Sequence, residues 1–292
     1  HWHTLTRTGK SARLSAHINE PYLLVHPVDA QKYKLSDTAL VTVTSEWGNS
    51  IARCVISNDQ KQGCVFMPMH WNKQFAANGC VDNVVNPVTD PVSGQPELKH
   101  TPVNIKPVNM QWEGFLISRD PLEIKTPYWV RAIGKQHMSY QIAGDVQQAW
   151  PDWARENLSK HDQDYDWLEY QDESIGRYRA ACIKEGSLHS CLFIAKSYSE
   201  LPDKNWLEQL FEEESLDKVE RACLLAGKPA NGTVNPGATV CSCFSVGRNT
   251  IINSIIEHNL TTAEELGEIL QAGTNCGSCV PELRNLLCST KK

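Results

Sequence analysis

Long apolar runs are missing from this sequence, and so is any excess of basic residues. No uninterrupted apolar stretch approaches the roughly 18 residues that a membrane-spanning helix needs, so no membrane span is predicted. Lys and Arg number 28 against 34 Asp and Glu, which gives a formal net charge of −6. A general nucleic-acid binder presents a basic surface, so this charge balance argues against that class. We therefore expect neither a membrane nor a nucleic acid as a partner.

An initiating methionine is also missing, because the chain begins HWHTLTRTG. We expect the sequence to be the C-terminal part of a longer protein, in which case the lack of a leading signal carries no information. Its 292 residues are enough for two or three domains of ordinary size.

Cysteine, by contrast, is abundant, and its 11 copies make an odd number. Cys54, Cys182 and Cys191 each stand alone in an apolar, strand-like run. Free cysteine behaves as a small buried hydrophobe, and proteins that keep their thiols reduced are mostly cytoplasmic. We predict that these three are core residues of a reduced, cytoplasmic protein.

Residues 1–108 are predicted to form a β-rich first domain. Val41 and Val43 alternate with threonines in 39–45, a turn follows at Gly48, and 50–57 returns as a second strand. Pro27 favours the first turn of a short helix. A further apolar strand is predicted in 63–71 and is expected to be stopped by Pro68. The four prolines in 72–102 indicate a long loop, which is typically functional or disordered.

Residues 109–229 are predicted to form a mixed α+β middle domain. RYRAACI and LHSCLFIA flank a turn at Gly186 and favour a hairpin, and Pro151 favours the start of a helix. The acidic stretch 197–220 is typical of a solvated helical face, and the alternative is a docking surface for a basic electron-transfer partner.

Residues 230–292 are predicted to form a small all-α domain after a Gly/Pro/Asn-rich linker. Isoleucines at helical spacing, a capping-box pattern from Thr262 to Glu265 and Pro281 before a leucine stripe predict three short helices. A unit of about 50 residues has a small core, and a metal or cluster commonly supplements it.

Four cysteines of this unit fall in two close pairs. The pattern is Cys241-x-Cys243, then 32 residues, then Cys276-x-x-Cys279. Each pair offers two thiolates from one turn, which suits a metal site. A thioredoxin-type redox pair is disfavoured because the surrounding βαβ pattern is missing. Zinc and an iron–sulfur cluster both accept four thiolates, so the spacing leaves these two alternatives open.

The segment VCSCFSVGRNTI…ELGEILQAGTNCGSCVPELRNLL resembles the bacterioferritin-associated-ferredoxin-like [2Fe–2S] domain. The resemblance covers 240–287 and includes all four cysteines and the VG that follows the first pair. It implies that Cys241, Cys243, Cys276 and Cys279 are the ligands of a [2Fe–2S] cluster. Cys288 matches no ligand position.

The first ten residues concentrate hydroxyls, imidazoles and cations, which suit a phosphate-bearing ligand. An ordinary polar surface segment is the alternative. Two other segments have ordinary structural alternatives to a role in cofactor binding. PMHW (68–71) fits the buried end of a strand, and 82–99 fits an ordinary loop rich in Pro and Asn.

Taken in order, WHTLTRTG, EPYLLVHPVDA, VTSEWGN, VFMPMHW and DPVSGQPELK resemble the C-terminal molybdopterin-dinucleotide-binding domain of molybdenum oxidoreductases. The resemblance spans about 1–106 and implies a double-psi β-barrel. NVVN stands where that family often has an NxLT-like stretch, so the match at Asn83 is looser. The implied cofactor-binding residues are His3, Thr4, Thr6, Arg7, Thr8, His70, Trp71, Asn83, Gln95 and Lys99.

The order of these domains resembles that of the assimilatory nitrate reductases. The resemblance implies reduction of nitrate to nitrite at molybdenum held by bis(molybdopterin guanine dinucleotide), with a [4Fe–4S] cluster in an upstream part. It also implies a flavoprotein or ferredoxin-type electron donor. In that family the molybdenum ligand lies upstream, so no catalytic residue is predicted in this chain. The alternatives are another molybdopterin oxidoreductase, such as a formate-dehydrogenase-like enzyme, and a non-catalytic four-cysteine zinc-binding interaction module.

Overall fold

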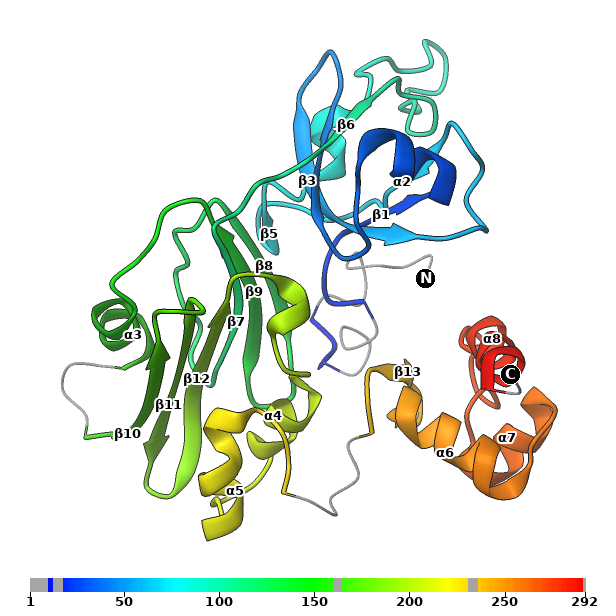
Figure 1. The fold of residues 1–292 in the computed structure, drawn as a ribbon. Coiled ribbons are helices and arrows are strands. Elements are labelled where there is room, and N and C mark those ends of the chain that lie inside the picture. Colours follow the sequence, from blue (N-terminus) through cyan, green and yellow to red (C-terminus); the bar gives the residue numbers. More distant parts are fainter. Residues whose placement is uncertain (1–9, 13–17, 160–163, 231–235, 291–292) are drawn as a thin grey trace.

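The computed structural model describes residues 10–12, 18–159, 164–230 and 236–290. Three regions follow one another along the chain: a small mixed sheet, a large antiparallel sheet flanked by helices, and a helical unit (Figure 1).

The first region is built on a five-stranded mixed sheet in the order β4-β1-β3-β2-β6. β1 runs parallel to β3, while β2 lies antiparallel to β3 and β6. Val41 and Val43 both point into the core, as their alternation with threonine predicts. The elements of this region are β1 (Tyr22–Val25), α2 (Pro27–Tyr33), β2 (Leu40–Thr44), β3 (Asn49–Ile56), β4 (Val65–Phe66), β5 (Ala76–Ala77), η1 (Val81–Val84) and β6 (Asn104–Pro107).

Two local predictions for this region are confirmed and one holds in part. Helix α2 begins at Pro27, as expected, and His26 Nδ1 accepts the Val28 N–H at 3.2 Å. Between 72 and 102, β5 and η1 are the only named elements among the described residues. The strand predicted in 63–71 shrinks to β4, because Pro68 has no N–H to donate and His70 adopts a φ of 80°.

The second region is a seven-stranded antiparallel sheet in the order β10-β11-β12-β7-β9-β8-β5. The predicted hairpin is confirmed: β11 and β12 are joined by Glu185 and Gly186, both with positive φ, as a two-residue turn of this type requires. The strands that this region adds are β7 (Trp112–Ser118), β8 (Tyr128–Ile133), β9 (Met138–Gly144), β10 (Asp166–Asp172), β11 (Arg177–Lys184) and β12 (Ser187–Ala195).

Helices cover both faces of this sheet. On one face, α3 (Trp150–Leu158) buries Trp150 against Trp112 and Tyr178, with ring centroids 4.7 and 6.3 Å apart. On the other face, α4 (Asn205–Leu210) packs Leu207 and Leu210 into a second cluster. The remaining short helices are η2 (Tyr198–Glu200), α5 (Lys218–Cys223) and η3 (Leu224–Ala226). The acidic stretch 197–220 therefore folds as short helices, with the apolar residues of α4 buried against the sheet and residues 212–214 exposed to solvent.

Three cysteines predicted to be core residues are buried and free. Cys54, Cys182 and Cys191 are all inaccessible to solvent. Burial raises the pKa of the Cys54 thiol to about 11 and that of Cys182 to about 12, because an apolar surrounding disfavours the thiolate. These thiols are therefore neutral packing groups.

The third region is helical, as predicted. A two-stranded ribbon of β13 (Thr239–Cys241) and β14 (Val246–Gly247) leads into α6 (Arg248–His258), α7 (Ala263–Leu270) and α8 (Val280–Thr290). Ile251, Leu266 and Leu283 meet at the centre of its core. None of the helices in the described ranges has both the length and the apolar composition to cross a membrane.

The capping box predicted at the start of α7 is present, with the Glu265 N–H donating to Thr262 Oγ1 at 3.2 Å. Replacing Thr262 with alanine leaves that N–H without its partner, so we expect the unfolding free energy of the helical domain to fall by about 1 kcal/mol. Chemical denaturation measures the loss. Thr262→Ser keeps the acceptor oxygen and should retain most of the stability; an equal loss in both variants would contradict the capping role.

Candidate functional site

The four predicted ligands of the helical domain come together as two pairs of thiols. Cys243 Sγ lies 3.4 Å from Cys276 Sγ, and the Cys241 and Cys279 thiols are hydrogen-bonded to each other. Each pair therefore joins one cysteine of the CxC motif to one of the CxxC motif. All four are free cysteines, and 3.4 Å is far longer than a disulfide bond of about 2.05 Å.

The surroundings of the two CxxC cysteines shift their pKa values in opposite directions. Hydrogen bonds from the Ser278 hydroxyl, the Ser278 backbone N–H and then Cys243 lower the pKa of Cys276. Burial, followed by the charge of Cys241 and the hydrogen bond with it, raises the pKa of Cys279 to about 12, although the Gly273 N–H acts against this rise. A bound cation would remove that penalty, since coordination favours the thiolate.

The pairing of the sulfurs can be compared with the needs of a single metal ion and of a two-metal cluster. Two sulfurs bound about 2.3 Å from one tetrahedral ion lie roughly 3.8 Å apart, close to the spacing of Cys243 and Cys276. Four-thiolate zinc needs all four sulfurs around one centre. Yet within the described residues no three His, Cys, Asp or Glu side chains gather in a way that could hold one ion. Two pairs suit a [2Fe–2S] cluster, in which each iron takes two thiolates.

An orphaned hydroxyl supports the same fit. Ser242, between the cysteines of the first motif, has a buried Oγ with no hydrogen-bond partner among the described residues. A buried hydroxyl normally has a partner, and a sulfur of a bound cluster would supply one. In the second motif Gly277 has a φ of 70°, which lets the chain turn between Cys276 and Cys279.

Two of the predicted pterin contacts line one cavity of the first region. His70 and Lys99 share a cavity of about 660 Å³ with Tyr22, Phe66 and Met67. A mostly apolar cavity of this size with an imidazole and an ammonium group at its wall fits part of a large phosphate-bearing ligand. The positive φ of His70 marks the kind of backbone strain that is often retained at a binding site.

The other predicted contacts lie elsewhere. Trp71 is 1% exposed and packs among Leu40, Phe75 and Tyr128, although its Nε1 has no partner in the described residues. Asn83 is exposed on η1, between two valines that line the cavity, and Gln95 lies in the exposed 87–100 loop. The remaining predicted contacts fall outside the described residues: His3, Thr4, Thr6, Arg7 and Thr8.

Reasoning from sequence missed Tyr22, Phe66 and Met67, although the segments quoted for the resemblance contain them. Phe66 follows Val65 in β4, and Tyr22 begins β1, its neighbour in the sheet. Their rings lie 6.1 Å apart at the cavity wall.

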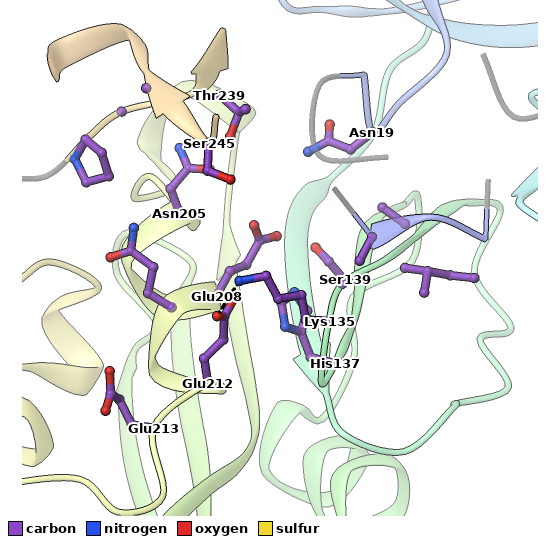
Figure 2. Close-up of a pocket in the computed structure, with 18 residues that line it drawn as sticks. Asn19, Lys135, His137, Ser139, Asn205, Glu208, Glu212, Glu213, Thr239 and Ser245 are labelled. Atoms are coloured by element: carbon purple, nitrogen blue, oxygen red, sulfur yellow. Dashed lines mark hydrogen bonds and ion pairs between the residues drawn. The ribbon is translucent and has the colours of Figure 1, made fainter. Parts of the chain in front are cut away.

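A second, acidic cleft separates the large sheet from the start of the cluster domain (Figure 2). It has a volume of about 430 Å³, and its lining includes Glu208, Glu212 and Ser245, which lies two residues after Cys243. Lys135 forms an ion pair with Glu212 at 2.6 Å. His137 is buried, and desolvation lowers its pKa, which favours the neutral imidazole. No sequence pattern predicted this cleft, because its walls come from distant segments.

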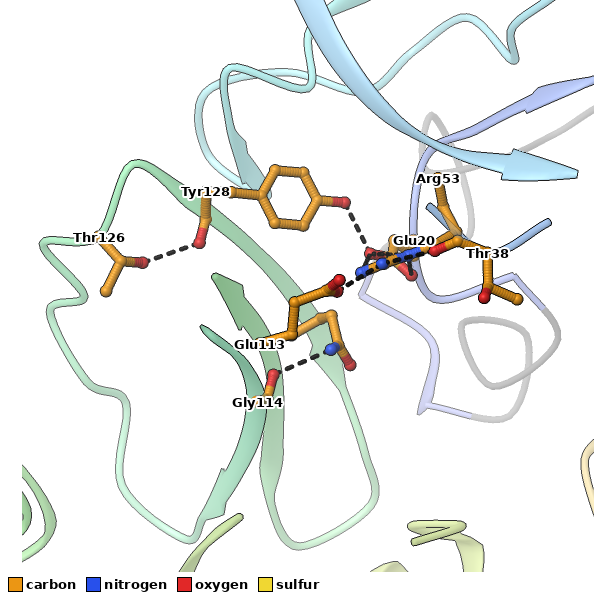
Figure 3. Close-up of polar contacts among 8 residues, drawn as sticks. Glu20, Thr38, Arg53, Glu113, Gly114, Thr126 and Tyr128 are labelled. Carbon is orange, nitrogen blue, oxygen red and sulfur yellow. Dashed lines mark hydrogen bonds and ion pairs between the residues drawn. The ribbon is translucent and has the colours of Figure 1, made fainter. Parts of the chain in front are cut away.

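A buried network of charges joins the first region to the large sheet (Figure 3). The Arg53 guanidinium of β3 is within 2.8 Å of Glu20 Oε1 and 2.5 Å of Glu113 Oε2 of β7. Tyr128 of β8 donates its hydroxyl to Glu20 at 2.7 Å. Desolvation raises the pKa of Glu113, and the charge of Arg53 acts against that rise. Arg53 therefore links the two regions through buried ion pairs.

Two domain models match the chain. Residues 1–102 match the molydopterin dinucleotide binding domain, and residues 239–289 match the BFD-like [2Fe-2S] binding domain. Both domain resemblances predicted from the sequence are thereby confirmed.

Some similar proteins align with nearly the whole chain and others with only part of it. A nitrate reductase of Klebsiella oxytoca is 37% identical over 98% of this chain and 32% of its own length. The F420-dependent formate dehydrogenase subunit alpha of Methanocaldococcus jannaschii is 38% identical over 36% of this chain and 15% of its own. The nitrogen fixation protein NifU of Trichormus azollae is 38% identical over 19% of each. The chain spans about a third of the nitrate reductase.

Proposed function

We propose that this chain, which combines a molydopterin dinucleotide binding domain with a BFD-like [2Fe-2S] binding domain, is the C-terminal part of a molybdenum-dependent nitrate reductase. Its own roles would be to cover the molybdopterin guanine dinucleotide and to relay electrons through a [2Fe–2S] cluster. Bound molybdenum supplies the two-electron reduction of nitrate to nitrite, while the protein orients and tunes the cofactor.

The observation that carries the proposal is that each cysteine of the CxC motif lies beside one of the CxxC motif. It stands in a chain of which 98% aligns with a nitrate reductase at 37% identity. A relay that takes single electrons from a donor suits a site holding a one-electron cluster. The finer features that we propose are an assimilatory, cytoplasmic enzyme, a flavoprotein or ferredoxin-type donor and a [4Fe–4S] cluster upstream. We also propose three domains: a double-psi barrel in 1–108, a mixed α+β middle domain in 109–229 and a cluster domain in 230–292.

At the pterin cavity, His70 and Lys99 would hold the dinucleotide. The Lys99 ammonium would pair with a phosphate, and His70 would donate a hydrogen bond from its ring. Tyr22 and Phe66 would exclude water from the apolar part of the cavity. The segment holding His3, Thr4, Thr6, Arg7 and Thr8 would add further phosphate partners.

Spectroscopy with metal analysis tests the cluster. The 292-residue chain, purified anaerobically, is expected to show visible absorption bands and two irons per chain. Four-thiolate zinc gives no visible bands, so a colourless protein with stoichiometric zinc would refute the relay and favour the zinc-binding module.

Nitrate-dependent oxidation of reduced methyl viologen tests the activity of the whole enzyme. We expect oxidation with nitrate and none with carbon dioxide as acceptor. The second candidate is a formate-dehydrogenase-like enzyme, which the 38% identity over 106 residues favours. Formate-dependent reduction of benzyl viologen, without any nitrate reduction, would select it.

A further inference from the structure

The two cysteine pairs of the proposed cluster site differ in exposure. Cys241 and Cys279 are only 2% and 4% exposed and belong to the apolar core of the domain. Cys276 is exposed and Cys243 is half-buried. A two-metal cluster on these four sulfurs therefore has an inner metal ion, held in the core, and an outer metal ion at the surface.

Hydrogen bonding differs between the pairs as well. Cys276 Sγ lies 3.0 Å from the Ser278 hydroxyl, and the Ser278 backbone N–H also bonds this sulfur. Cys279 is bonded by backbone N–H groups, with no side-chain hydroxyl among the interactions that shift its pKa. A hydrogen bond to a charged sulfur is stronger than one to a neutral sulfur, so it gains strength when negative charge is added.

On the premise of the proposed function, we propose that the cluster is reduced at the outer metal ion, held by Cys243 and Cys276. The Ser278 hydroxyl is the positioning group that directs the electron there. A one-electron donor gives up one electron, and the outer ferric ion becomes ferrous. No bond to a cysteine breaks, and no proton is transferred.

Solvation explains why the electron goes to the outer metal ion. The added charge spreads onto the sulfur ligands of the reduced ion, and burying unpaired charge in an apolar core is costly. Water and Ser278 stabilise it at the outer pair, whereas the inner pair belongs to the same buried apolar cluster as Ile251 and Leu283. Solvent exposure and hydrogen bonds to sulfur are among the factors that set the potentials of such clusters.

Reductive titration of the cluster-loaded chain with dithionite tests the role of Ser278. Ser278→Ala is expected to make reduction roughly tenfold less favourable, about 59 mV more negative for one electron, and to alter the electron paramagnetic resonance spectrum of the reduced cluster. Ser278→Thr keeps the hydroxyl and should restore the potential. Ser245→Ala is the matched control: Ser245 lies two residues after Cys243 as Ser278 lies two after Cys276, but makes no side-chain hydrogen bond within the described residues.

Ligand exchange tests which ion is reduced. A serine oxygen is a harder ligand than sulfur and favours the ferric state, so Cys276→Ser should lower the potential and change the resonance spectrum more than Cys279→Ser does. If either ligand variant fails to assemble a cluster, the Ser278 series decides. An intact cluster with unchanged potential and spectrum in Ser278→Ala, or a larger shift in Cys279→Ser, overturns this proposal alone. A chain that takes up no iron overturns the proposed function and this proposal together.

Discussion

Replacing Cys279 with alanine is expected to abolish cluster binding: the visible bands disappear and the bound iron falls to background. Cys279 is 4% exposed and its thiol contacts that of Cys241, so alanine at this position would leave a buried metal ion without one of its sulfur ligands. Because the helical domain is small, loss of the bound group should also lower its melting temperature sharply.

The matched control for this variant is Cys288→Ala. Cys288 is an exposed cysteine on α8 of the same domain and matches no ligand position. It should keep full iron content and the wild-type spectrum. Cys279→Ala could lower the melting temperature by losing the cluster or by leaving a gap in the core. Iron-free wild type and iron-free Cys279→Ala should melt at similar temperatures if loss of the cluster is the cause. Retention of two irons by Cys279→Ala would contradict the ligand assignment.

Replacing Arg53 with methionine is expected to destabilise the protein by about 3–5 kcal/mol, because removing one partner of a buried ion pair leaves the other charge uncompensated. Here two carboxylates, those of Glu20 and Glu113, would lose their cation, and Thr38 O would lose a donor at 2.8 Å. The guanidinium also stacks 4.3 Å from the ring centroid of Tyr198, and that contact would be lost too. Urea unfolding at pH 7 measures the change.

The pH dependence of the Arg53→Met deficit has a definite sign. Desolvation already raises the pKa of Glu113, and without Arg53 this rise is unopposed. A carboxyl with a folded-state pKa above its unfolded value binds more protons when folded, so stability increases as the pH falls. The deficit should therefore shrink between pH 7 and pH 5, and Glu113→Gln should partly rescue the variant.

Arg221→Met is the matched control for charge removal. Arg221 pairs with Asp166 at 3.1 Å, but both side chains are largely exposed. An exposed pair contributes about 1 kcal/mol or less. Equal losses in the two variants would show that the burial of Arg53 has no energetic consequence.

Local patterns in the sequence predicted local structure well. The alternation at Val41 and Val43, the turn at Gly186, the proline at the start of α3 and the Thr262 cap each depend on residues within a few positions of one another. The spacing of the four cysteines also predicted that thiols of the two motifs would lie close together, since each motif is one turn.

Long-range pairing was beyond such patterns. The partners of Arg53 lie 33 and 60 residues away, and nothing near Glu20 or Glu113 in the sequence indicates an ion pair. The acidic cleft likewise depends on α4, the β8–β9 turn and the loop after Cys243 coming together from distant parts of the sequence. The pairing of the four cysteines also needed the structure, because spacing does not reveal which cysteine of one motif meets which of the other.

Strand β5 has a consequence for how this polypeptide can be subdivided. Its two residues, Ala76 and Ala77, come from the first region but hydrogen-bond to Trp129 and Val130 at the border of the large sheet. A gene fragment that starts at residue 109 would uncover one side of β8, and unpaired strand edges promote association between chains. Expression of the middle region by itself therefore favours inclusion bodies, and a well-behaved recombinant fragment should begin upstream of residue 76.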